Sequence, residues 1–363
     1  MNKPLLGLVV AIAGLALVLA LRGNKEERPA PAKADRTAPA SPGAGRQPAE
    51  AVLAISPSVL AARPEVAKPK RSPLIEEFES KRDRKGMYDR LAGLASRTGE
   101  ENYVLAEILN TCRHAAAYKG EPVEGLIEQA RKQATAGLSP KDPMRERRLA
   151  AYDAIYAGTG VCKGFRDVTI TKERVRELME AGARAGDPRA QARLIELDVW
   201  APLAKFENDP VQMVRRESMP SMSEAQLLAL QQAVATNDPA VLMVAARLFG
   251  TSMGDLQVRA GPDERAVDIQ AFHDAWVLAA CDAGSDCGSA HEMILGGCYA
   301  MGNCDAGNLR DYLFFYMNSP QRSQLVAQYQ AQIQRAIQAR DWSYFQFHRG
   351  PPAVGTMAMH PPP

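Results

Sequence analysis

The sequence predicts an all-α protein of stacked helical hairpins, as in an α-solenoid, after an N-terminal membrane anchor and a disordered linker. Three observations predict this: an apolar N-terminal run, a body rich in capped helix starts, and the lack of alternating strand patterns. The 363 residues are 46% hydrophobic and 24% charged, as in ordinary globular chains. This composition excludes a fibrous chain, a fully disordered chain and a polytopic membrane protein.

Residues 1–21 are predicted to form a signal anchor. From Pro4 to Leu21 the chain carries no charge, and as a helix this run would span about 27 Å, enough to cross a bilayer core. A cleaved signal peptide is the alternative, but the nearest small-x-small triplet, Ala30-Pro31-Ala32, lies beyond several charged residues. A third interpretation, a buried soluble helix, would require an amphipathic pattern that the run lacks.

Two signals disagree about the side of the membrane on which the body lies. Arg22, Lys25 and Arg28 follow the run, and by the positive-inside rule they would place the body in the cytoplasm. The six cysteines indicate an oxidising compartment instead. Because Lys3 and the amino terminus offset most of the charge asymmetry, we expect a single-pass inner-membrane protein with its body in the periplasm. After signal cleavage it would be secreted.

Residues 22–72 are predicted to be a Pro/Ala-rich linker, and residues 348–363 a disordered tail. The linker holds eight prolines and twelve alanines and cannot bury enough apolar surface to offset its ordering entropy. Its only apolar island is Ala51 to Leu60. In the tail, Met357, Met359 and His360 are potential copper ligands, but such a set is common by chance, so no metal site is predicted.

The charge of the chain is divided unevenly. Residues 1–72 hold 11 Lys and Arg against 5 Asp and Glu, whereas residues 73–363 hold 33 against 37. The body is therefore mildly acidic, and we expect no nucleic-acid partner.

The body, residues 73–347, carries explicit helix-start signals. Capping-box patterns occur at Thr98-x-x-Glu101, Ser223-x-x-Gln226 and Ser289-x-x-Glu292. A capping residue precedes a proline at Asp142-Pro143, Asp187-Pro188, Asp238-Pro239 and Ser319-Pro320. Apolar residues then recur at spacings of three and four, so each signal predicts an amphipathic helix.

Helix corners recur at a nearly constant interval. Gly137, Gly186, Asn237 and Gly284 are 49, 51 and 47 residues apart, and glycine and asparagine tolerate the left-handed conformation that ends a helix. A hairpin that recurs in this way indicates an α-solenoid. A non-repetitive helical bundle with hairpins of similar length is the alternative.

One of these hairpins resembles a known repeat. Residues 178–194 (LMEAGARAGDPRAQARL) are similar to the Sel-one-like branch of tetratricopeptide repeats, at Ala181, Ala183, Gly186, Ala190 and Leu194. Residues 232–248 match loosely, and the Gly-x-Gly part of the repeat is matched only weakly, at residues 156–161. The body also resembles secreted bacterial helical proteins built on such hairpins. The resemblance implies a protein-interaction scaffold and carries over no catalytic residue.

The even number of cysteines predicts three structural disulfides. A helix between Cys287 and Cys298 would hold them about 16 Å apart, too far for a bond. The local pairs Cys281–Cys287 and Cys298–Cys304 are favoured, which leaves Cys112 for Cys162. A zinc site is the alternative for the last four, but C-x5-C is longer than the usual zinc spacing.

Other motifs give no convincing chemistry. Gly250-Thr-Ser252-Met-Gly254 matches a hydrolase elbow, but a predicted helix rather than a strand precedes it. His114, His273 and His291 lie in predicted helices without metal-ligand spacing. Arg145, Arg147 and Arg148 are expected to form a solvated face, and the aromatic stretch from Asp311 to Tyr316 a buried helix rather than a ligand groove. No catalytic residue, cofactor site or metal site is predicted.

The sequence thus favours a membrane-tethered, extracytoplasmic scaffold that binds another envelope protein. An enzyme on a helical scaffold, acting on cell-wall material, is the alternative, and perturbed carboxylates in a cleft would favour it. A purely structural envelope protein is the third possibility.

Overall fold

The computed structural model describes residues 71–80, 83–117, 131–133, 135–165, 167–204, 221–250 and 256–349. The predicted anchor, the linker as far as residue 70 and the tail from residue 350 lie outside these ranges. Among the described residues no helix is both long and apolar enough to cross a bilayer.

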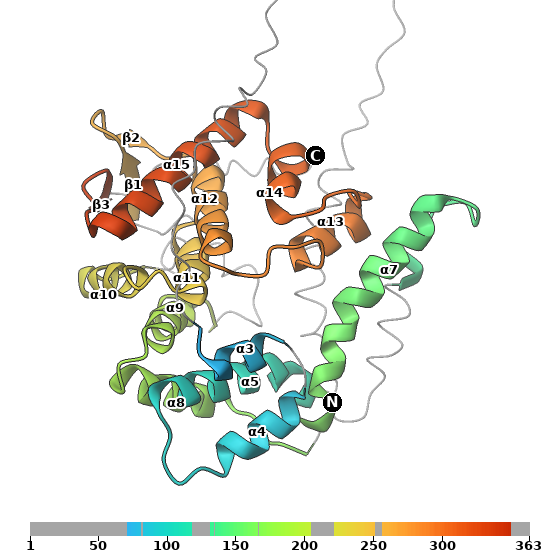
Figure 1. Ribbon diagram of the computed structural model, residues 1–363, viewed down its shortest axis with the longest axis horizontal. Coiled ribbons are helices and arrows are strands. Elements are labelled where there is room, and N and C mark those ends of the chain that lie inside the picture. Colours follow the sequence, from blue (N-terminus) through green and yellow to red (C-terminus); the bar gives the residue numbers. More distant parts are fainter. Residues whose placement is uncertain are drawn as a thin grey trace, which may run out of the picture.

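These residues form mostly helices, with one small sheet (Figure 1). The helices are α3 (Pro73–Glu79), α4 (Arg84–Ala92), α5 (Gly99–Ala117), α7 (Pro143–Ala157), α8 (Lys172–Arg184), α9 (Pro188–Ala204), α10 (Glu224–Val234), α11 (Pro239–Phe249), α12 (Ile269–Asp282), α13 (Glu292–Met301), α14 (Leu309–Tyr312) and α15 (Pro320–Ala339). A 3-10 segment, Gly158–Phe165, follows α7, and a π-helical turn, Leu313–Met317, follows α14.

Most of the predicted helix starts are confirmed. The Thr98 hydroxyl accepts the Glu101 N–H at 3.2 Å while the Glu101 carboxylate accepts the Thr98 N–H at 2.7 Å, and Ser223 forms the same capping box with Gln226. The four predicted prolines are the first residues of α7, α9, α11 and α15.

The predicted start at Ser289 is wrong. Helix α13 begins at Glu292, and the His291 ring caps it by accepting the Met293 N–H at 3.2 Å. Gly288 forms an isolated β-bridge with Asn308, which keeps the chain extended just before this point. Glu292 is therefore the first helical residue rather than the partner of a serine cap.

All four predicted corners adopt the left-handed conformation, with φ of 82° at Gly137, 85° at Gly186, 55° at Asn237 and 113° at Gly284. At Gly186 the Asp187 N–H donates to the Gly182 carbonyl at 3.1 Å, which closes the end of α8. Helix α9 then packs back on α8, and α11 packs on α9. After Gly284, however, α13 packs on the much earlier α7, so the regular hairpin pattern does not continue there.

The expectation of essentially no sheet is wrong for three short segments. Strand β1 (Leu256–Ala260) pairs in antiparallel fashion with β2 (Arg265–Ala266) on one side and β3 (Phe345–Arg349) on the other. In strand β1, burial alternates over only three positions, Leu256, Gln257 and Val258, which is too short for a clear period of two. Strand β3 also extends the fold two residues beyond the predicted end at residue 347.

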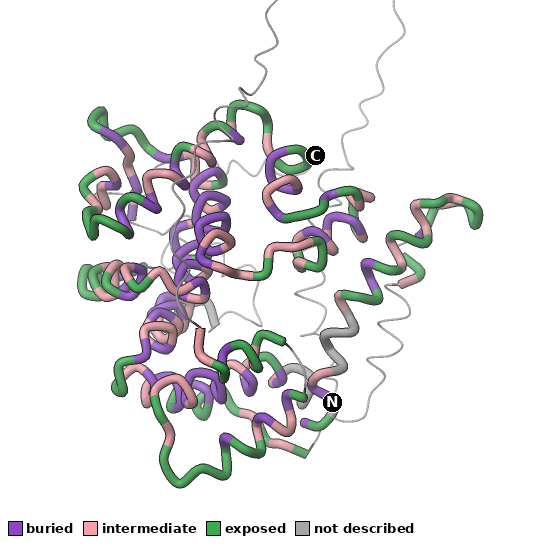
Figure 2. Tube along the Cα trace, viewed as in Figure 1, coloured by how far each residue is buried: buried purple, intermediate pink, exposed green. Residues whose placement is uncertain are grey.

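Two hydrophobic cores meet at α9. One contains buried residues of α4, α5, α8 and the 3-10 segment, and the other runs from α9 to β3 around the fully buried Trp276. Helix α9 contributes Ala190 to the first core and Ile195 and Val199 to the second. Figure 2 shows α12 as a mostly buried helix, and it packs between α11 and α15.

The three disulfides are those that the spacing predicts. Cys112 pairs with Cys162, Cys281 with Cys287 and Cys298 with Cys304, at Cα–Cα distances of 5.3, 5.7 and 4.3 Å. Because no cysteine remains free, none is left as a zinc ligand.

Candidate functional site

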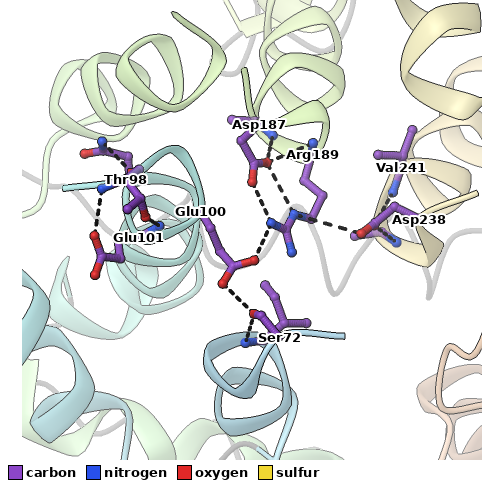
Figure 3. A network of polar contacts seen from close by, with 12 residues as sticks. Ser72, Thr98, Glu100, Glu101, Asp187, Arg189, Asp238 and Val241 are labelled. Atoms are coloured by element: carbon purple, nitrogen blue, oxygen red, sulfur yellow. Dashed lines mark hydrogen bonds and ion pairs between the residues drawn. The ribbon is translucent and has the colours of Figure 1, made fainter. Parts of the chain in front are cut away.

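Two polar sites lie along α9, and they differ in how completely their charged side chains are paired with one another. The first, which we call the helix-start junction, gathers the N-terminal ends of α3, α5, α9 and α11 (Figure 3). It surrounds a cavity of about 250 Å³. The charged side chains that line the cavity are Arg71, Glu79, Glu100, Arg189 and Asp238.

Arg189 is the centre of the junction. Its Nη2 atom lies 2.5 Å from the Asp187 carboxylate and 2.8 Å from that of Glu100, and its Nε atom lies 4.0 Å from the Asp238 carboxylate. Asp187 also accepts the N–H groups of Arg189 and Ala190, so it caps α9 while it holds the guanidinium. One arginine thus links the starts of three helices.

The edge of the predicted linker joins the same network. The Ser72 hydroxyl caps α3 and donates to Glu100, while Arg71 contacts the Glu79 carboxylate and the Gly284 carbonyl. These two residues, assigned by sequence to the linker, therefore already belong to the folded body.

Burial affects the carboxyl groups of the junction. Desolvation raises the pKa of Glu79, although Arg71 opposes it, and likewise raises the pKa of Asp238, although Arg189 and two backbone N–H groups oppose it. Both carboxylates have cationic neighbours, and Asp238 also caps α11. The arrangement mainly holds helix ends together.

The second place is a groove formed by α5, α8 and α9, with a volume of about 350 Å³. We call it the α5–α8–α9 groove. Its apolar surface comes from Val175, Leu197, Trp200 and Ala201. Its polar residues are Asn110, Arg113, Lys172, Glu173, Arg176, Arg193 and Glu196.

An ion-pair cluster supports the groove from α9. Arg193 lies 2.9 Å from Glu107 of α5 and contacts Glu196, whose carboxylate also binds Arg247 of α11 at 2.5 and 2.9 Å. Burial opposes ionisation of Glu196, but hydrogen bonds and charge from Arg247 and Arg193 outweigh it and lower its pKa. The cluster therefore fixes three helices relative to one another.

Arg113 differs from the other arginines of the groove. Its Nε atom is buried, and among the residues that the structure describes it has no hydrogen-bond partner. The preceding residue, Cys112, is fully buried and bonded to Cys162 in the 3-10 segment. A covalent bond thus holds α5 in place beside an arginine whose hydrogen-bonding capacity is not filled.

The motifs tested by sequence are not gathered into one site. Ser252 lies outside the described residues. Gly250, which ends α11, packs against His273, and the His273 ring lies 3.0 Å from the buried Asp274 carboxylate. Asp274 also accepts from Gln270 and Asn318, so it ties α12 to the residue that follows the π-helical turn. In the described part of the chain, no group of three or more His, Cys, Asp or Glu side chains is arranged to hold a metal.

Two expectations about side chains need correction. Arg147 is not merely solvated, because it binds the Asp305 carboxylate at 2.6 Å and the Cys304 carbonyl at 2.7 Å. The aromatic stretch is only partly buried: Tyr312 and Phe314 enter the core, whereas Phe315 is 65% exposed. The π-helical turn changes the register and thus turns Phe315 outward.

Sequence reasoning missed Arg113, Arg189 and Trp200. Arg189 follows the Asp187-Pro188 start signal, so its place at a helix end was visible, but the convergence of several helix ends was not. Arg113 and Trp200 carry no local motif, and only the packing of α5 beside α8 and α9 brings them together.

Comparison with known proteins gives no relative. The chain matches no protein-family model, no curated protein and no solved structure.

Proposed function

We propose that the protein is a membrane-tethered scaffold outside the cytoplasm and that its body, a solenoid-like stack of helical hairpins, binds another envelope protein. The residues 4–21 would hold it in the inner membrane, and the linker would give it reach. The three disulfides support an oxidising location. The resemblance of the α8–α9 hairpin to Sel-one-like repeats supports the scaffold role.

The observation that carries the proposal is the α5–α8–α9 groove. It combines an indole and aliphatic side chains with charged residues, and it is built on helices that a disulfide and an ion-pair cluster hold in place. Rigid, partly apolar concavities with a few polar groups are typical binding sites. At the junction, by contrast, the charged groups already bind one another.

Photo-crosslinking in cells that make the full chain tests this function. A crosslinking amino acid at the exposed Ala201 of the groove should give one discrete product with an envelope protein. The matched control is the exposed Ala339 at the end of α15. Equal product patterns at both positions, or none at Ala201, would contradict the proposal.

One observation favours a second candidate, an envelope enzyme. Glu79 and Asp238, whose pKa values burial raises, both line the cavity of the junction, and such carboxyl groups can act as general acids. Release of soluble fragments from purified cell-wall material by the full chain would support it. That release should then be lost in Glu79→Gln and Asp238→Asn and kept in Glu173→Gln, which changes a carboxylate of the other site.

A further inference from the structure

We propose that the α5–α8–α9 groove recognises an acidic peptide segment in which an Asp or Glu lies beside a large apolar residue. The apolar side chain would pack on Trp200 and Leu197, and the carboxylate would bind Arg113. This inference rests on the proposed scaffold function and specifies the chemistry of the partner.

The first argument is local charge. The body as a whole has more acidic than basic residues, with 37 against 33. Four cationic side chains line the groove against two carboxylates, but two of the four have carboxylate partners of their own. Arg176 pairs with Glu180 and Asp198, and Arg193 with Glu107 and Glu196, so Arg113 carries the charge argument. One of the two carboxylates that line the groove, Glu196, is already neutralised by Arg193 and Arg247. A cation without a carboxylate partner among the described residues, on a body with an excess of acidic residues, favours an anionic ligand at the groove.

The second argument is the state of Arg113. A buried guanidinium nitrogen without a hydrogen-bond partner costs free energy, and a carboxylate is the group that best fits a guanidinium. The comparison with Arg193 is direct, since that arginine lines the same groove but has carboxylate partners in Glu107 and Glu196. Within the described residues, Arg113 therefore lacks the carboxylate partners that Arg193 has, and because its Nε atom is buried, a ligand carboxylate would bind its guanidinium through the Nη atoms.

The third argument is the form of the groove. Trp200 and Leu197 are half-buried, so each keeps apolar surface that a ligand side chain can cover. A volume of about 350 Å³ is at the small end for ligand sites, which suits one large side chain and its neighbour rather than a whole domain. The N-terminal end of α8, at Lys172 and Glu173, also lies at the groove, and its dipole favours a negative charge.

The test uses random heptapeptides displayed on phage and selected against the full, oxidised chain in detergent. The selected peptides should be enriched in Asp or Glu next to Leu, Phe or Trp. Their affinity, measured by fluorescence anisotropy on labelled synthetic copies, should fall as salt concentration rises. It should also fall when Asp and Glu are replaced by Asn and Gln in the peptide.

Variants locate the interaction. Arg113→Gln should weaken the binding of the selected peptides about tenfold, the equivalent of about 1.4 kcal/mol, and Arg113→Lys should restore part of the loss. Lys172→Gln, on an exposed side chain, should weaken it less and serves as a second variant that does not disturb the core. Arg184→Gln is the matched control, because Arg184 is 72% exposed on α8 and does not line the groove.

The outcomes separate this inference from the proposed function. Selected peptides without acidic enrichment, or equal affinity for wild type, Arg113→Gln and Lys172→Gln, would overturn the charge argument. If such neutral peptides still competed with the crosslink at Ala201, the scaffold function would stand. A concentration-dependent dimer that the Arg113→Gln change dissociates would overturn the inference in favour of a second copy of the chain.

Discussion

The helix-start junction and the α5–α8–α9 groove lie along the same helix and use charge in opposite ways. At the start of α9, Arg189 is shared among carboxylates that also cap helices or meet other helix starts. Further along α9, Arg193 and Glu196 form a closed cluster, but Arg113 beside them keeps a buried nitrogen without a partner in the described part of the chain. The contrast teaches that the paired charges hold helices together, whereas the arginine without a partner is the group to which our proposal assigns a ligand.

The largest effect is expected from the disulfide beside the groove. Replacing Cys112 and Cys162 with serine reopens a loop that spans 50 residues, which on chain-entropy grounds costs about 4 kcal/mol of the free energy of unfolding. The Cys281–Cys287 loop spans only 6, so the matched double variant should cost about 2 kcal/mol. Urea unfolding measures both.

This pair of variants also separates the two sites. Because Arg113 follows Cys112, the first variant should weaken peptide binding in the groove, and the second should leave it unchanged. Equal stability losses, or equal effects on binding, would show that the long disulfide has no special role at the groove.

The next effect is at the junction. Arg189→Ala removes a side chain that is 11% exposed and leaves Asp187 and Glu100 without their guanidinium, so we expect a loss of about 3 kcal/mol in the free energy of unfolding. Peptide affinity of the groove should not change. The control is Arg174→Ala, which removes an exposed pair with Glu177 and should cost under about 1 kcal/mol. Similar losses for both variants would contradict the view that the junction holds the helices together.

The sequence predicts local features of the two sites, such as helix caps and corners, better than contacts between distant segments. The caps at Thr98, Asp187 and Asp238, and the corner conformations, depend on a few neighbouring residues, and the structure has them where expected. Cysteine pairing was also accessible, because a helix limits which cysteines can meet. The short strands were missed because five residues carry little periodicity, and β1 and β3 are far apart in sequence.

Neither site could be derived from the sequence. The junction requires four helix starts from different parts of the chain to meet, and the groove requires α5 to lie beside α8 and α9. Only tertiary packing brings these distant helices into contact, and no local sequence pattern encodes it. The turn outward at Phe315 was missed for a similar reason, since a π-helical turn shifts a side chain that an α-helical period would bury.

The pH dependence of stability should differ between the two sites. Glu196 has a lowered pKa in the folded protein, so its stabilising contribution is present at neutral pH and is lost as pH falls below its ordinary value of 4.5. Glu196→Gln should therefore cost about 2 kcal/mol at pH 7 and make the acid limb of the stability curve less steep.

Asp238 has a raised pKa, so the folded protein holds this proton more tightly than the unfolded chain does. The stability linked to the proton is therefore full at low pH and is lost as pH rises through the folded pKa. Asp238→Asn keeps a capping side chain and should change stability at pH 7 by less than about 1 kcal/mol. Urea unfolding from pH 3 to pH 7 measures both variants. An acid limb in Glu196→Gln as steep as in wild type would refute the assignment of acid sensitivity to this cluster.

The smallest effect concerns the corner that connects α8, at the groove, with the start of α9, at the junction. Gly186 has φ of 85° and nothing within 4 Å of the position that an alanine methyl group would occupy, so Gly186→Ala meets no clash and reports only the cost of the left-handed backbone, about 1 kcal/mol. Gly296, within α13, is equally unobstructed but has an ordinary helical backbone, so Gly296→Ala should stabilise by about 0.5–1 kcal/mol. Thermal unfolding should thus give shifts of opposite sign for the same chemical change. If Gly186→Ala also stabilised the protein, the corner between α8 and α9 would not need a residue that tolerates the left-handed conformation.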